Sequence, residues 1–167
     1  MTLKPNARRV VSSVSVALLA LTVPFVGASS ASVPPQARHM STVPARSGSP
    51  TSTVDHVANF YGAYIDVLHD TGHNSLANSL RHHYLTAGLR KSLAQWEAAH
   101  HRDGVLRSKA VPSAWKVTYQ DSGMGHCWTV VQLTWRDARH RTHHSYLTVQ
   151  SDLATRDISG IKVGSAR

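Results

Sequence analysis

The chain has 167 residues, a formal net charge of +9 and a single cysteine. This length accommodates one domain with a real hydrophobic core, and it excludes two ordinary domains once the first fifty residues are set aside. Because Cys127 has no second cysteine to pair with, no internal disulfide can form, and stability has to come from core packing.

The first 31 residues have the layout of a secretory signal peptide. Lys4, Arg8 and Arg9 precede a mostly apolar run over residues 10–26, and small residues follow that run. A membrane anchor is the alternative, but the run is short and Pro24 interrupts it. We therefore expect a bacterial signal peptide, exported by the general or the twin-arginine route, and a secreted, extracellular product without a membrane span.

Residues 32–52 are rich in proline and serine and hold almost no large apolar side chain. Such a composition buries too little apolar surface to fold by itself, so it predicts a disordered tether or pro-segment. The folded part is then a single domain over residues 53–167.

The first predicted helix organises this domain. Its apolar residues recur at three- and four-residue steps, as on one face of a helix: Val57, Tyr61, Tyr64, Ile65 and Leu68. Thr53 precedes the run and can cap the helix, and Gly72 follows it, so we expect the helix to end near Asp70.

Two shorter helices are predicted after it. Asn74 or Ser75 can cap the first of them, which runs toward Tyr84. Thr86 can cap the second, which frays after residue 97 and is expected to end at Gly104.

From Pro112 onward the apolar period changes to two. This alternation predicts strands near residues 115–119, 127–135, 145–150 and 158–163, separated by polar turns. Because helices come first and an antiparallel meander second, the predicted class is α+β, with N-terminal helices packed on a sheet of about four strands.

Four short patterns, taken in order, resemble a known superfamily. They are Phe60-Tyr61-x-x-Tyr64, Tyr84-Leu85-Thr86-x-x-Leu89, Val111-Pro112-x-x-Trp115 and Ile158-Ser159-x-Ile161. Over Val54 to Val163 the chain resembles exported bacterial domains of unknown function in the nuclear transport factor 2-like, or cystatin-like, superfamily. The resemblance implies a strongly curved sheet wrapped around the first helix, a cone with a cavity at its wide end. Members of the superfamily include isomerases, dehydratases and non-catalytic binding modules, so the fold does not decide the function.

Twelve histidines raise the question of a metal site. Asp66, His69, Asp70 and His73 would share one helical face if the first helix continued, and their imidazole and carboxylate groups suit zinc or a similar ion. Gly72 interrupts the helix before His73, however. The sequence therefore predicts no metal site and no cofactor, with these four residues as the weak candidates.

Acid–base catalysis in a cone needs an ionisable side chain inside an apolar cavity. Asp66 beside a tyrosine hydroxyl is the arrangement to consider, but helical geometry turns Asp66 away from Tyr61 and Tyr64. Glu97 and Asp103 are placed at a fraying helix end, and the remaining aspartates fall in turns. No acidic residue is therefore expected in the core, and Asp103, which follows two histidines, is the first to examine if that expectation fails.

Four tryptophans complete the set of candidate residues. Trp96, Trp115 and Trp135 are expected to pack in the core. Trp128 lies on the opposite face of its strand from Trp135, where it meets a second layer or anchors a partner. The residues expected to contact a ligand or partner are Tyr61, Tyr64, Trp96 and Trp128.

These features favour a secreted, non-enzymatic domain that binds an extracellular small molecule or protein. The alternative is a small cofactor-free isomerase, dehydratase or hydrolase acting in the cone cavity. Signal cleavage would leave a charge of +6, which suits loose contact with anionic cell-wall polymers. The basic residues are scattered, with Arg136, Arg139 and Arg141 as their dense cluster, which argues against nucleic-acid binding. The sequence leaves the oligomeric state open.

Overall fold

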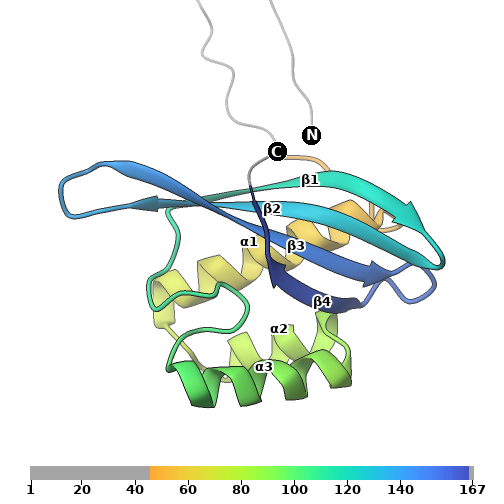
Figure 1. The fold of residues 1–167 in the computed structure, drawn as a ribbon, viewed down its shortest axis with the longest axis horizontal. Helices are drawn as coiled ribbons and strands as arrows, with labels where there is room; N and C mark the ends of the chain where they lie inside the picture. Colours follow the sequence, from red (N-terminus) through yellow and green to blue (C-terminus); the bar gives the residue numbers. More distant parts are fainter. Residues whose placement is uncertain (1–45, 166–167) are drawn as a thin grey trace, which may run out of the picture. The chain divides into compact units, whose positions relative to one another are not determined.

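The computed structural model describes residues 46–165, which form three helices followed by four strands (Figure 1). The helices are α1 (Thr53–Thr71), α2 (Ser75–Tyr84) and α3 (Ala87–His100), and the strands are β1 (Ala114–Gly123), β2 (His126–Arg136), β3 (Thr142–Asp152) and β4 (Ile158–Val163). The predicted α+β class and the order of helices before strands are confirmed. The predicted signal peptide and the tether up to residue 45 lie outside the described residues.

Side-chain oxygens fix where each helix begins. Ser52 caps α1, Asn74 caps α2 and Thr86 caps α3, each by accepting a hydrogen bond from a backbone N–H of the first turn. The prediction that Thr53 caps α1 is wrong by one residue, because the Ser52 hydroxyl reaches the Asp55 N–H at 3.1 Å.

Helix α3 ends earlier than predicted. His101 follows it in the left-handed conformation with φ of 50°, so the helix ends at His100, four residues before Gly104. The chain then runs through residues 102–113 outside any helix or named strand, and this loop folds back on itself where the Asp103 N–H donates to the Ser108 carbonyl at 2.9 Å. The loop carries much of the site described below.

The four strands form an open antiparallel sheet in the order β1-β2-β3-β4. On its inner face, Val131 of β2 lies opposite Val117 of β1 and Leu147 of β3. Met124 and Gly125 form the β1–β2 turn with positive φ at both positions, the geometry that two-residue hairpins prefer. A cone-shaped sheet is not confirmed and stays a prediction.

Helix α1 contributes the centre of the core. Its completely buried side chains are Val57, Phe60, Tyr61 and Tyr64. In Figure 1, α1 lies along one face of the sheet, and it contacts β1 and β2, whereas α3 contacts β4. Trp135 is buried as predicted, while Trp96 and Trp115 are half-buried. Within residues 46–165, no helix has the length and apolarity needed to cross a bilayer.

The described end of the predicted tether contacts the domain. Arg46 places its guanidinium 4.6 Å from the centre of the Trp115 ring and donates to the Asn59 side chain at 3.1 Å. Ser49 donates its N–H to Asp55 at 2.7 Å. Residues 46–52 therefore lie along α1 and β1.

Candidate functional site

Asp103 is a carboxylate that the fold buries, with 4% of its side chain exposed. The expectation that no acidic residue lies in the core is therefore wrong. That expectation rested on helical and strand periodicity, whereas Asp103 belongs to the loop after α3, whose path is set by contacts with α1 and α2.

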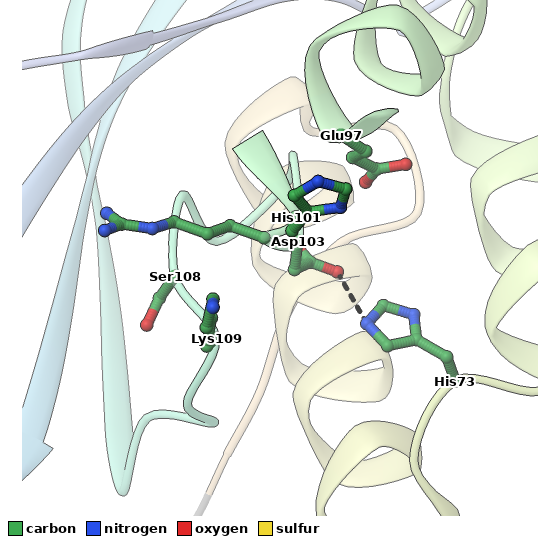
Figure 2. A pocket seen from close by; sticks show the side chains of 7 residues that line it. His73, Glu97, His101, Asp103, Ser108 and Lys109 are labelled. Carbon is green, nitrogen blue, oxygen red and sulfur yellow. Dashed lines mark ion pairs between the residues drawn. The ribbon is translucent and has the colours of Figure 1, made fainter. Parts of the chain in front are cut away.

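Every oxygen of the Asp103 carboxylate has a partner. Oδ2 accepts from the Tyr64 hydroxyl at 2.6 Å and from Arg81 Nη2 at 2.9 Å, and Oδ1 accepts from the Leu106 N–H at 2.6 Å. His73 Nε2 lies 3.3 Å from Oδ2, the contact marked in Figure 2. The carboxylate thus holds three segments of the chain together and leaves no free oxygen for a ligand.

Arg81 joins this carboxylate to a second one. Its Nη1 and Nη2 donate to the two oxygens of Glu97 at 3.0 and 2.7 Å, and its Nε donates to the Tyr64 hydroxyl at 2.9 Å. Burial alone raises the pKa of Glu97, but hydrogen bonds from Arg81 and the Gly104 N–H outweigh it and hold this pKa below its usual value. Glu97 is therefore an ionised partner of Arg81 rather than a solvated residue at a fraying end.

The surroundings also fix the state of Tyr64. Burial, and then the negative charge of Asp103, raise the pKa of Tyr64 far above its usual value. Its hydroxyl therefore stays protonated and serves as a donor to Asp103. We call the four residues Tyr64, Arg81, Glu97 and Asp103 the Arg81 network.

A pocket of about 480 Å³ opens beside the Arg81 network. Figure 2 shows it between the α1–α2 turn, the end of α3 and the loop that follows α3. The residues that line it are His73, Glu97, His101, Arg102, Asp103, Ser108 and Lys109. The pocket and the network beside it hold two carboxylates, Glu97 and Asp103, and three cations, Arg81, Arg102 and Lys109. Their summed charge is positive before the histidines are counted.

The four weak metal candidates do not come together. Asp66, His69 and Asp70 are exposed, and Asp66 faces outward as helical geometry predicted. His73 turns instead toward Asp103. Among residues 46–165, no group of three or more His, Cys, Asp or Glu side chains is placed to hold a metal ion.

The four predicted ligand contacts lie in separate surroundings. Tyr61 and Tyr64 are completely buried. Trp96 has the His100 ring stacked on it, with ring centres 4.2 Å apart, and the Arg107 guanidinium lies 4.3 Å from its ring centre. Trp128 is half-buried on the outer face of the sheet, beside a small pocket of about 120 Å³.

Sequence reasoning missed Arg81, although a local signal marks it. Arg81 lies four residues after buried Ala77 and three before Tyr84, which places it on the apolar face of α2. Glu97 likewise continues the buried stripe of Leu89 and Leu93 on α3. An arginine and the sole glutamate on two apolar faces together indicate a buried ion pair.

The comparisons with known proteins bear on the fold alone. No protein-family model and no curated protein matches this chain. A crystal structure of a protein of unknown function from Bacteroides thetaiotaomicron superposes with a TM-score of 0.50 at 18% sequence identity. The match covers 66% of this chain and 88% of that chain. At this identity it shows a similar fold and assigns no function.

Proposed function

We propose that the described domain is a non-enzymatic binding module and that the pocket beside the Arg81 network takes an anionic group. The observation that carries this proposal is the pairing of Arg81 with both carboxylates of the pocket. Because Glu97 and Asp103 are occupied by Arg81, they are not offered to a ligand as acceptors. The side chains left facing the pocket are those of His73, His101, Arg102, Ser108 and Lys109.

These remaining groups suit phosphate or carboxylate. Guanidinium and ammonium groups make short, charge-assisted hydrogen bonds to such anions. His73 is already oriented, since its Nε2 lies 3.3 Å from Asp103, and in its imidazolium form it keeps an Nδ1–H that can donate to an anion. A volume of about 480 Å³ is within the range of small-molecule sites.

Calorimetric titration of the full protein with inorganic pyrophosphate tests the proposal. We expect saturable binding that Lys109→Gln weakens roughly tenfold, because a charge-assisted hydrogen bond contributes about 1.5–3 kcal/mol. Lys91→Gln is the matched control, since Lys91 is exposed on α3 and does not line this pocket. Equal affinity of the wild type and Lys109→Gln would contradict the proposal.

One observation favours the enzymatic alternative. The His73–Asp103 contact is the kind of pair that orients an imidazole for proton transfer, as a small hydrolase or isomerase requires. Within residues 46–165, however, no hydroxyl or thiol is hydrogen-bonded to His73, and Ser108 Oγ accepts from the Ala110 N–H instead. A screen of activated esters and enolisable ketones tests it: turnover abolished by His73→Asn would favour the enzyme.

The nuclear transport factor 2-like assignment and the secreted location are also proposals. The helices-first order and the position of α1 along the sheet support the first. An experimental structure with an open, uncurved sheet would contradict it. The layout of residues 1–31 supports the second, and mass spectrometry of culture supernatant should find a chain that begins near residue 29 or 32.

A further inference from the structure

A second pocket adjoins the first. It has a volume of about 380 Å³, and Ser108 lines both pockets. Its lining includes Arg107 and Ser108 from the loop after α3 and Arg136 and His143 from the β2–β3 hairpin, with Leu106 and Trp135 among its apolar residues. The loop after α3 thus meets the base of the β2–β3 hairpin, about thirty residues later in the chain.

Arg107 is held in place at this second pocket. Its Nη2 donates to the Ile161 carbonyl at 2.9 Å, and its guanidinium lies over the Trp96 ring. Its Nε is buried and has no hydrogen-bond partner among residues 46–165. Because Nε is buried, a ligand would meet the positive charge of the fixed guanidinium rather than this donor, and a charge fixed in position is preorganised to attract an anion.

The hairpin continues the positive charge outward. The tip between β2 and β3 projects beyond the helices in Figure 1. Arg136, Arg139 and Arg141 are exposed there, together with His140. Asp137 is the acidic residue of the tip, and Arg141 Nε already donates to it at 2.8 Å. Arg136 and Arg139 therefore remain as uncompensated cations.

We propose that the two pockets and the hairpin tip form one track for an extended polymer with phosphate groups along its length, such as a phosphodiester-linked polymer of the cell envelope. The inference rests on the proposed function, because the first pocket is one end of the track. Charge complementarity carries it: Arg102 and Lys109 line the first pocket, Arg107 and Arg136 line the second, Ser108 lines both, and Arg139 is exposed on the tip.

The chemistry of the track favours such a polymer over a membrane or a nucleic acid. Trp135 is buried and Ala138 is the largest apolar side chain within residues 137–141, so the tip has no anchor to insert into a bilayer. Among the aromatic residues that line the second pocket, Trp135 is buried, Tyr146 is half-buried and His143 is stacked on Trp135, so the track presents no row of exposed rings on which successive bases could stack.

The test compares long-chain inorganic polyphosphate with pyrophosphate on the full protein at low salt. We expect the long chain to bind at least tenfold more tightly. The double variant Arg136→Ser/Arg139→Ser should lose about tenfold in polyphosphate affinity, with a slope of log K against log salt shallower by about 1.4, and keep its pyrophosphate affinity. Lys91→Ser/Lys116→Ser is the matched control, since both lysines are exposed and line neither pocket.

The outcomes separate the two proposals. Pyrophosphate binding with no effect of the double variant on polyphosphate would overturn the track and leave the anion pocket standing. Binding of neither probe would overturn both. Tighter binding of duplex DNA than of polyphosphate at equal phosphate concentration would overturn the track in favour of a nucleic acid. Stronger binding to phosphatidylglycerol vesicles than to polyphosphate would overturn the track in favour of a membrane surface.

Discussion

Two buried tyrosines on α1, three residues apart, have opposite surroundings. Tyr61 and Tyr64 are both completely buried. The Tyr64 hydroxyl donates to Asp103 and accepts from Arg81, whereas the Tyr61 hydroxyl has no hydrogen-bond partner among residues 46–165. Burial, and then the charge of Asp103, raise the pKa of each tyrosine well above its usual value. Burial is therefore common to both tyrosines. Only the surroundings of Tyr64 connect α1, α2 and the loop after α3 through hydrogen bonds.

Removing the cation at the centre of the Tyr64 region should have the largest effect. Arg81→Met leaves Glu97 and Asp103 without their cation, and breaking a buried pair in this way costs about 3–5 kcal/mol. Urea denaturation should therefore show a loss of this size in the free energy of unfolding.

Arg139→Met is the control for that measurement. The Arg139 side chain is exposed on the hairpin tip and lies outside the core, so its removal should change stability by less than about 0.5 kcal/mol. A loss for Arg81→Met no larger than that of the control would mean that the network does not stabilise the fold.

Tyr64→Phe should have the next largest effect. The change keeps the ring but removes a donor to Asp103 and an acceptor for Arg81, at a cost of about 1–3 kcal/mol. Combining it with Arg81→Met in a double-mutant cycle should give less than the sum of the two losses, because both act on one network. Strict additivity would contradict the coupling.

The effect of acid on stability through His56 should be smaller than the losses at Arg81 and Tyr64. His56 Nε2 is buried without a partner among the described residues. Burial, and then the positive charges of Arg156 and His83, hold the pKa of His56 below its usual 6.5, against the opposing effect of Asp157. The folded state thus favours the neutral ring, so the stability present above about pH 6.5 should fall as the pH drops below that value.

Thermal melts at about pH 7.5 and about pH 5.5 measure this effect. The midpoint should fall on acidification, and it should fall less in His56→Gln. His69→Gln serves as the control, because His69 is exposed, and it should keep the full decrease. An equal decrease in His56→Gln and the wild type would assign the acid sensitivity to other groups.

The smallest effect is expected at Tyr61. Tyr61→Phe removes a buried hydroxyl that has no partner, so the free energy of unfolding should change by less than about 0.5 kcal/mol or rise slightly. A loss as large as that of Tyr64→Phe would show that the two regions do not differ in the way described.

The fold was largely predictable because its signals are local. The alternation of residues 115–119 and 127–135 reports two faces of a strand, and Asn74 and Thr86 cap helices from within their own turns. The site was not predictable in the same way. Asp103 and Tyr64 are separated by 39 positions, and no periodicity relates a loop residue to a helix that far away. The ion pair of Arg81 with Glu97 could have been predicted, because each residue lies on the apolar face of its helix. Asp103, the second carboxylate that pairs with Arg81, lies in a loop and has no such pattern.

Histidine side-chain NMR during a pyrophosphate titration tests the central claim most directly. If Arg81 occupies both carboxylates, the side chains that remain in the pocket are donors to an anion. The ring signals of His73 and His101 should then shift together and saturate. The signals of His69 and His82, which are exposed and do not line this pocket, should stay in place. Unchanged His73 and His101 signals, or equal shifts at all four histidines, would contradict an anion site in this pocket.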